Sequence, residues 1–561
     1  MIRRYAVPAW ALALAVLMLG PALGHGYVLT YDMVWVPDLA VRSDFLGAGT
    51  ALPRAVPSDA VVAVLDAVLP GMLLQKVVLV GTLLLGGLGA ARLVGPSVVA
   101  RLAAVSVFVW SPLVVERLWI GHWPLLLCWA VLPWLVAAAV RFRADARIGA
   151  ALPFLLLIGS LSANAGLMSA LTVLAVGLTW RGAAKLVLLV VAANAPWLVA
   201  GLLHASDATS SAAGALFGLG SEGLPAPLAA LSLGGIWNAE VVPSSRDGVL
   251  LPLVLTVLLL AAAAFGAQPA ARRLGRRTTG ALVGLWVLGY GLAVLSWAAP
   301  DAIGWVAAHV PGGGLLRDGA RFLVLCAPLT VVLVAAGVER LAHRWRDPAP
   351  RVVVAVAAAL VPLAVMPDAA WGISGNLRPA IYPADYAAAR SALDDAPPGD
   401  VLVLPFTSYR APAWNHDRKV LDPLPRYLQP NYVVNDQLAV DGRLIDGEDP
   451  RVPEVLAALR EPTPETRATA LGEIGIGVVA RETDVPTNAT YDAPIAGTVL
   501  HQGADVELVA LDTPVDAREV TTGWWIALAA AWAGFLGVVG LGLWHAFRSG
   551  ASRMRTRPRS G

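Results

Sequence analysis

Charged residues are scarce in this sequence. Asp, Glu, Lys and Arg make up 14% of its 561 residues, whereas hydrophobic residues make up 57%. Soluble domains typically carry about 25% charged residues, so this chain has too little charge to cover a water-facing surface. The net charge of +2 is also too small to favour a nucleic-acid partner. The composition therefore predicts a membrane protein that binds no nucleic acid.

Cysteine is almost absent as well. The two cysteines, Cys128 and Cys326, both lie inside apolar runs, and free cysteines are among the most buried residue types. This placement excludes a disulfide scaffold and predicts two thiols that pack as small hydrophobic side chains.

Long apolar runs are what the sequence has in abundance. A membrane-spanning helix needs about 20 mostly apolar residues, and this criterion predicts about twelve spans. Two of them are short, and the polar junction between them at Ser160, Ser162 and Asn164 also suits a pair that re-enters the membrane without crossing it. The predicted spans are 6–24, 74–94, 98–115, 123–140, 148–161, 163–180, 184–203, 248–268, 279–298, 321–340, 351–368 and 523–545.

Arginine alternates between the connections that join these spans. Short cytoplasmic loops are enriched in Lys and Arg, and here every second connection is basic. A single orientation satisfies the whole chain and predicts that both termini are cytoplasmic, in the plasma (inner) membrane of a bacterium. The basic segments, besides Arg3 and Arg4, are 92–101, 141–147, 181–185, 272–277, 340–351 and 548–559.

The first span has a second interpretation. Arg3 and Arg4, an apolar core and the small residues at 22–24 also fit a cleavable signal peptide. Cleavage would lower the number of helices and leave the orientation of the other spans unchanged.

Residues 369–520 break the apolar pattern. Charge rises, Pro and Asp become frequent, and no run is long enough to span a membrane. Short buried-strand candidates alternate with helical stretches, which indicates a small α/β domain, and the arginine pattern places it outside the cytoplasm. The predicted division is a membrane domain at 1–368, this α/β domain at 369–520, a last membrane helix at 521–546 and a basic tail at 547–561. The strand candidates are 401–405, 474–480 and 506–511, and the helical stretches are 385–393 and 452–459.

Two acids follow the first span directly. Asp32 and Asp38 lie in a loop rich in aromatic residues, Tyr27 to Leu39. A carboxylate at the membrane surface, partly shielded by aromatic side chains, can act as a general base. The same residues also fit a solvated loop beside an interfacial aromatic belt, and the pattern alone leaves both interpretations open.

Two further connections on the same predicted side carry ionisable residues. One holds Glu116, Arg117 and His122 between two tryptophans, where the acid and the arginine either serve a site or neutralise each other. The other holds Arg317, Asp318 and Arg321. Two arginines on the non-cytoplasmic side run against the usual distribution of positive charge. They require an anionic partner, which is either a bound phosphate or Asp318.

The layout resembles a known family. A short N-terminal segment, an acidic loop after the first helix, about ten further spans and a C-terminal domain on the outer face are similar to the GT-C class of membrane glycosyltransferases. The stretches 31–38 and 314–321 look like those of the actinobacterial members that build arabinan and mannan. The resemblance implies a polyprenyl-phosphate sugar as donor and a cell-envelope glycan or glycolipid as acceptor. It also implies an acid of the first loop as catalytic base, either Asp32 or Asp38. Many members have adjacent acids or a D-x-D pair. Here the acids are six residues apart, which leaves the use of a divalent metal open.

The C-terminal region resembles the outer domains of related large membrane proteins. Some of its side chains are of types that stack on sugars or hydrogen-bond to them, and they are equally common as core and loop residues. These are Trp414, Asn415, His416, Tyr427 and Asp436.

Three functions therefore compete. The first is an inverting glycosyltransferase in which Asp32 deprotonates the acceptor and Arg317 and Arg321 hold the leaving phosphate. Glu116, Arg117, His122 and Asp318 would complete its substrate site. The second is a transporter or flippase, but such proteins place ionisable residues near the bilayer midplane, and here these residues gather at one rim. The third is a non-catalytic protein of cell-envelope assembly.

Overall fold

The computed structural model describes residues 2–205, 213–394, 396–435, 437–440, 443–445, 449–483, 485 and 491–555. Within them, ten helical segments are long and apolar enough to cross a membrane. They are α1 (Ile2–Leu19), α3 (Gly71–Leu93), α4 with α5 (Val98–Val109, Pro112–Trp119), α6 (Trp123–Asp145), α9 (Ala183–Leu203), α12 (Leu250–Leu274), α13 (Arg276–Ala298), the 3₁₀ segment Gly319–Cys326 with α15 (Ala327–Ala342), α16 (Pro348–Val365) and α22 (Thr522–Arg555). The chain is a polytopic helical membrane protein.

The two shortest predicted spans differ from the rest. Segments 148–161 and 163–180 form α7 (Ala151–Ile158) and α8 (Ala163–Gly177), of 8 and 15 residues. At 1.5 Å per residue, α7 is about 12 Å long, less than half the hydrocarbon thickness of a bilayer. The turn between them is capped by Ser162, whose side chain accepts a hydrogen bond from the amide of Ala165. The described residues thus contain ten helices of spanning length, and α7 and α8 are shorter than these ten.

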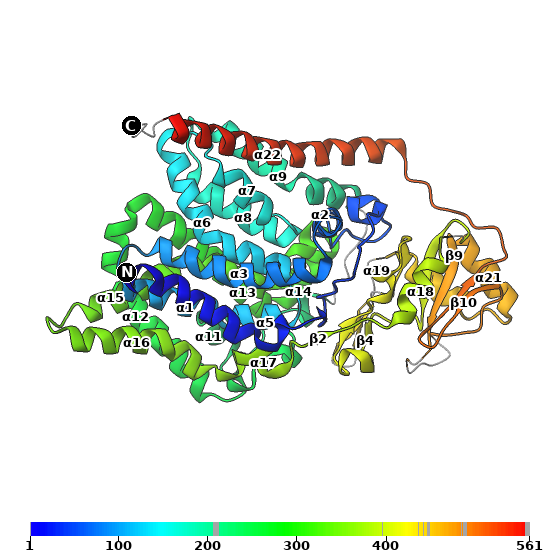
Figure 1. Cartoon of the computed structure of the whole chain (residues 1–561), viewed down its shortest axis with the longest axis horizontal. Helices are drawn as coiled ribbons and strands as arrows, with labels where there is room; N and C mark the ends of the chain where they lie inside the picture. Colours follow the sequence, from blue (N-terminus) through cyan, green and yellow to red (C-terminus); the bar gives the residue numbers. More distant parts are fainter. Residues whose placement is uncertain are drawn as a thin grey trace, which may run out of the picture.

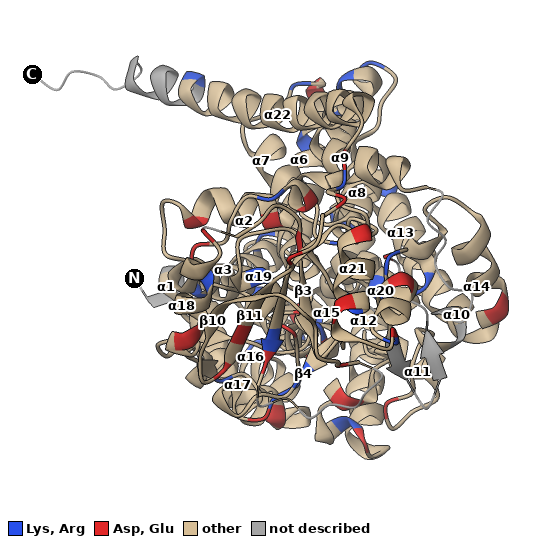
Figure 2. Cartoon of the chain, turned by 90° about the vertical axis from the view of Figure 1, so that its right-hand side faces the viewer, with Lys and Arg blue, Asp and Glu red and all other residues tan. Residues whose placement is uncertain are grey.

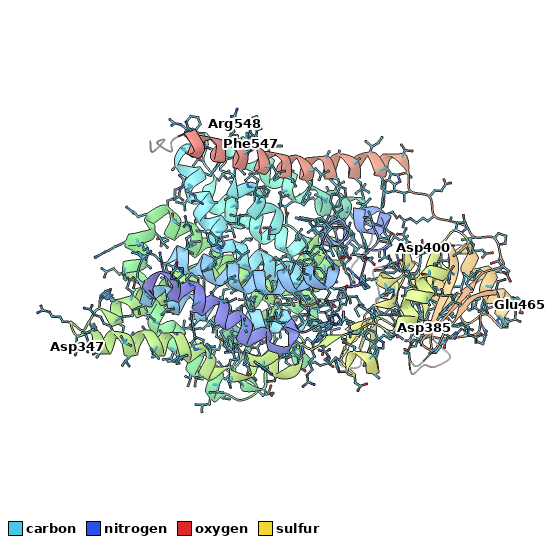
Figure 3. All side chains as sticks on the ribbon, in the orientation of Figure 1. Asp347, Asp385, Asp400, Glu465, Phe547 and Arg548 are labelled. Atoms are coloured by element: carbon cyan, nitrogen blue, oxygen red, sulfur yellow. The ribbon has the colours of Figure 1, made fainter. Side chains whose placement is uncertain are left out.

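Both chain ends lie at the same end of the helix bundle (Figure 1). Asp347, in the basic connection between α15 and α16, lies at this end together with Phe547 and Arg548 (Figure 3). Asp385, Asp400 and Glu465 lie at the opposite end, which carries the strands. Seen from that end, charged residues are scattered over the strand-bearing face, whereas α22 is uncharged over most of its length (Figure 2).

We refer to residues 379–511 as the α/β domain. Its five-stranded sheet has the order β10-β11-β9-β3-β6, in which β3 runs parallel to β9 and β6 and the other pairs are antiparallel. The sheet's strands are β3 (Asp400–Leu404), β6 (Tyr432–Val433), β9 (Ile476–Glu482), β10 (Thr498–Gln502) and β11 (Val506–Ala510), and the helices are α18 (Ala384–Ala392), α19 (Leu424–Tyr427), α20 (Val452–Ala458) and α21 (Pro464–Glu473). The three strands and two helices predicted in this region are confirmed as elements.

The core of the α/β domain explains why short apolar runs predict its central strands. Strand β3 is buried along Val401 to Leu404, and β9 is buried along Ile476 to Ala480. Central strands covered on both faces appear as continuous apolar runs instead of alternating patterns. Helices α20 and α21 contribute Val452, Val455 and Leu471 to the same cluster.

The first connection of the chain joins the bundle to the α/β domain. Its strand β1 (Tyr27–Val28) pairs antiparallel with β2 (Pro379–Ala380). Further along, the buried guanidinium of Arg42 donates hydrogen bonds to the carbonyls of Pro425 and Pro430, at 2.9 and 2.8 Å. The hydroxyl of Tyr382 donates to the carbonyl of Trp35 at 2.9 Å. The loop that carries Asp32 is therefore packed between the bundle and the α/β domain.

Candidate active site

A cavity of about 1350 Å³ opens where the first loop, the helix ends and the α/β domain meet. Its lining includes Asp32, His122, Arg317, Arg321 and several side chains of the α/β domain. Polar groups recur on the side of the α/β domain: Ser408, Tyr409, Lys419, Asn435 and Gln437. Enclosed sites with convergent polar groups are the usual location of small-molecule binding.

The opposite side of the cavity is apolar. Helices α6, α8 and α9 contribute Leu125, Leu167, Trp197, Leu198 and Leu202. Leu202 is 69% exposed, so this side of the cavity is open and not enclosed by the described residues. The cavity combines a polar part with an apolar part that suits a lipid chain.

Asp32 accepts a hydrogen bond at each carboxylate oxygen. His122 Nε2 lies 3.1 Å from Oδ2, and the hydroxyl of Tyr409 lies 2.7 Å from Oδ1. The Asp32 side chain remains 41% exposed, towards the cavity that it lines. Each carboxylate oxygen has two lone pairs, so both can accept a further hydrogen bond from a bound substrate.

The backbone around Asp32 is held from both sides. The amide of Asp32 donates to the carbonyl of Ile120 at 3.0 Å. Gly121 allows this approach, because a Cβ at this position would lie 2.2 Å from the amide nitrogen of Met33, and its φ of +90° is strained for any other residue. Behind the loop, the buried amide of Gln75 on α3 bonds both the N–H and the C=O of Val28, at 2.9 and 2.7 Å.

A chain of hydrogen bonds sets the tautomer of His122. Arg117 donates to His122 Nδ1 at 3.1 Å, so Nδ1 accepts and Nε2 carries the proton that is donated to Asp32. Arg117 is itself held by a bidentate pair with Asp318, at 2.8 and 2.9 Å. Nε of Arg321 lies 2.9 Å from Asp318 Oδ2 on the same carboxylate. The connection that holds Arg117 and His122 is thus joined, behind Asp32, to the connection that holds Asp318 and Arg321.

These neighbours keep Asp32 ionised and His122 neutral. Desolvation alone raises the pKa of the Asp32 carboxyl, but the hydrogen bonds from His122 and Tyr409 and the charge of Arg321 lower that pKa below its ordinary value. Burial, together with the positive charge of Arg321, lowers the pKa of His122 to about 4. Burial also raises the pKa of the Tyr409 phenol well above its ordinary value. At neutral pH the site holds a carboxylate flanked by two neutral donors.

The remaining predicted site residues fall into two groups. Arg317 and Arg321 line the cavity with Asp32 and His122, and the guanidinium of Arg317 lies 5.2 Å from the centre of the Phe217 ring. Arg117 and Asp318 are each 1% exposed and support His122 and Arg321 from behind. The structure therefore brings Asp32, His122, Arg317 and Arg321 to one cavity, with Arg117 and Asp318 as their supports.

Glu116 and Asp38 lie elsewhere. Glu116 is 2% exposed, and its Oε1 lies 3.9 Å from Nε of Arg246, which also pairs with Glu222. Its surroundings are those of a structural ion cluster. Asp38 is exposed, and its carbonyl accepts a hydrogen bond from Arg390 at 2.9 Å. Between the two candidate bases, only Asp32 is part of the cavity lining given by the described residues.

The aromatic and polar residues singled out in the C-terminal region are mostly packed. Trp414 and Tyr427 lie against Tyr382, with ring centres 5.1 Å apart in both pairs, and Asn415 is fully buried. His416 Nε2 lies 3.1 Å from the carbonyl of Pro379. Asp436 lies outside the described residues. Tyr409, which does reach the site, carries no motif by which the sequence could have distinguished it.

The described residues form no cluster of metal ligands at the cavity. Among the described residues, no three His, Cys, Asp or Glu side chains come together as metal ligands. Asp32 is bonded to a histidine whose other nitrogen faces an arginine, which disfavours a nearby cation.

Comparison with known proteins bears on the fold. No protein-family model matches the chain, and no curated protein is significantly similar to it in sequence. Two solved structures of arabinofuranosyltransferase AftD from mycobacteria are similar, with TM-scores of 0.55 and 0.52 at 18% and 19% identity. The second is of the mutant R1389S, class 2. These matches cover 91% and 92% of this chain but only 40% and 42% of AftD. The chain thus shares the fold of the matched part of AftD and spans less than half of that protein's length.

Proposed function

We propose that this protein transfers a glycosyl unit from a polyprenyl-phosphate donor to a glycan or glycolipid of the bacterial cell envelope, with Asp32 as general base. The observation that carries the proposal is the open cavity, which contains an ionised carboxylate, two arginines and an apolar side. The fold shared with AftD supports glycosyl transfer in cell-envelope synthesis.

The proposed reaction is a single displacement with inversion. Asp32 takes the proton of the acceptor hydroxyl as its oxygen attacks the anomeric carbon. The bond from that carbon to the donor phosphate oxygen breaks, and the released polyprenyl phosphate is held by Arg317 and Arg321. Guanidinium groups pair with phosphate through charge-assisted hydrogen bonds, and such stabilisation of a leaving anion is a large contribution to catalysis.

The proposal also assigns sides of the membrane. Positive segments and both chain ends lie at one end of the bundle, and the cavity and the α/β domain lie at the other. The positive-inside rule supports a cytoplasmic location for the first end and an extracytoplasmic one for the second. The last helix, α22, then returns the chain to the cytoplasm.

Substitution of Asp32 tests the function directly. Asp32→Asn keeps the side-chain shape and removes the base, so we expect transfer to fall by roughly 10²–10⁴-fold. The measurement uses purified protein, a panel of synthetic polyprenyl-phosphate sugars, short glycan acceptors and mass spectrometry of the products. Asp38→Asn is the matched control, since it makes the same chemical change six residues further along the loop, and it should retain most of the rate.

Three results would overturn parts of the proposal. Full activity of Asp32→Asn with loss in Asp38→Asn would move the base to Asp38. Full activity of both variants would remove the general-base mechanism. Absence of transfer by the wild type, combined with unchanged envelope glycans in a deletion strain, would favour a transporter or an assembly protein instead.

A further inference from the structure

Tyr409 reaches the site from the far end of the sequence. It lies on β4 (Tyr409–Arg410), which pairs antiparallel with β5 (Val420–Leu421). The backbone of β5 and of the residue before it in turn hydrogen-bonds to Tyr31 in the first loop. The amide of Tyr31 donates to the carbonyl of Lys419, and the amide of Leu421 donates to the carbonyl of Tyr31, both at 2.8 Å. A continuous backbone ladder therefore connects the strand of Tyr409 to the residue before Asp32.

The next residue anchors β4 to the α/β sheet. Arg410 is 4% exposed, and its guanidinium lies 2.5 Å from Glu482 on β9 and 3.1 Å from Asp422. A buried arginine with two carboxylate partners has little freedom to move, because separation would leave uncompensated charges. The position of the Tyr409 side chain is thus set by the α/β domain.

The phenol approaches the oxygen of Asp32 that His122 leaves open. Tyr409 lies 2.7 Å from Oδ1, whereas His122, from the membrane bundle, lies 3.1 Å from Oδ2. The edge of the Tyr31 ring packs near Tyr409, with ring centres 6.4 Å apart, and Nζ of Lys419 lies 5.8 Å from the Tyr409 ring centre. The carboxylate is held between one donor from each domain.

We propose that Tyr409 is a positioning residue through which the α/β domain completes the reaction centre. Its hydroxyl holds the Asp32 carboxylate in one orientation and favours its ionised form, leaving a lone pair on each oxygen for the acceptor hydroxyl. This inference rests on the proposed function. It predicts that the catalytic step, and not substrate binding, depends on the contact between the two domains.

Tyr409→Phe removes only the phenolic oxygen and tests the inference. Because this hydrogen bond is made to a charged group, its loss from a base that must be both ionised and aligned should lower kcat about tenfold. The KM for acceptor should stay within about twofold. The acid limb of the pH–rate profile should move upwards by about one pH unit, because the carboxylate loses a donor that stabilises its charged form.

Tyr382→Phe provides the matched control. It also removes a phenolic oxygen at the junction of the two domains, but that oxygen bonds the carbonyl of Trp35 instead of Asp32. A general weakening of the junction would affect both variants alike. If Tyr409 positions Asp32, the pH–rate profile should shift in Tyr409→Phe and stay unchanged in Tyr382→Phe. Melting temperatures in detergent identify any variant that fails to fold.

The outcomes separate this inference from the function itself. If the wild type transfers sugar and Tyr409→Phe has the same kcat and pH–rate profile, the inference is wrong and the proposed function stands. A raised KM with unchanged kcat would make Tyr409 an acceptor-binding residue and would also contradict it. If the wild type transfers no sugar with any donor of the panel, the proposed function fails and the inference fails with it.

Discussion

His122 is a neutral histidine set among charges. Arg117 bonds one ring nitrogen and Asp32 the other, and its side chain is only 12% exposed. Burial and the charge of Arg321 lower its pKa to about 4 from an ordinary value of 6.5. The histidine therefore acts as a fixed donor to the Asp32 carboxylate, and it is uncharged at neutral pH.

This lowered pKa predicts a pH-dependent stability. The unfolded chain binds a proton at His122 below about pH 6.5, whereas the folded protein binds it only near pH 4. The contribution of His122 to the free energy of unfolding is thus fully present above pH 6.5 and is lost as the pH falls from 6.5 to 4. At 1.36 kcal/mol per pKa unit it amounts to roughly 3 kcal/mol. Melting temperatures in detergent between pH 7.5 and 4.5 should fall less steeply in His122→Gln, which keeps an N–H donor but does not titrate. Equal slopes would contradict the assignment of His122 as neutral.

Arg317 and Arg321 should bind the phosphate of the sugar donor. Gln at both Arg317 and Arg321 removes the charges that line the cavity, and we expect the KM for a polyprenyl-phosphate sugar to rise roughly 10- to 100-fold, since each tenfold corresponds to 1.4 kcal/mol. Kinetics at varied donor concentration measure this change. Arg467→Gln on α21 removes one positive charge outside the cavity lining and should leave the KM unchanged. An unaltered donor KM in the double variant would make the arginines structural partners of Asp318.

At the scale of elements, the site depends on how closely two connections approach. The loop after α1 and the turn after α5 touch through the backbone of Asp32, Met33, Ile120 and Gly121. Asp32 is thus held in place by contacts between the two backbones. Loops held in this way by rigid elements are a common support for catalytic groups.

Gly121→Ala tests this contact. The added methyl group would lie 2.2 Å from the amide nitrogen of Met33 at a φ of +90°, so the loop must shift or the backbone must strain at a cost of about 1–3 kcal/mol. We expect a lower melting temperature and a loss of transfer with normal membrane insertion. Gly149→Ala, with no atom within 4 Å of its added methyl, should behave as wild type. A fully active Gly121→Ala variant would show that the base tolerates displacement.

At the scale of the whole molecule, the cavity forms where the membrane bundle and the α/β domain meet. Neither part contains it alone, because its lining comes from α6, α8 and α9 on one side and from residues 407–437 on the other. A lipid-linked substrate has one end in each environment, so a site at this junction suits both ends.

The proposed orientation is tested by reporter fusions. Fusions after Arg277 and Arg346 should report the cytoplasm, since both follow basic segments at the end of the bundle that carries the termini. Fusions after Trp237 and Gly399 should report the outer side. Paired reporters that are active on opposite sides of the membrane give the readout. A cytoplasmic signal at Gly399 would place the α/β domain and the cavity on the wrong side for the proposed function.

Local sequence properties determined the class of the protein and most of its elements. Apolar runs are a property of contiguous residues, so each of the ten helices of spanning length among the described residues overlaps a predicted span, and β3, β9 and β11 each overlap a predicted strand. The segments that form α7 and α8 were harder to assign. Their hydropathy matches that of a span, but the length of a helix depends on where the chain turns, here at Gly159 and Ser162.

Only the tertiary structure decided which of the candidate residues form a site. Sequence indicated three connections with ionisable residues, and the fold joined them through Arg117, Asp318 and His122 into one support for Asp32. It also separated Glu116 and Asp38 from the cavity. Tyr409 lies 377 positions from Asp32, and no local pattern marks it. Contacts at such separation depend on how the helices and the sheet pack together, which hydropathy and charge along the chain do not encode.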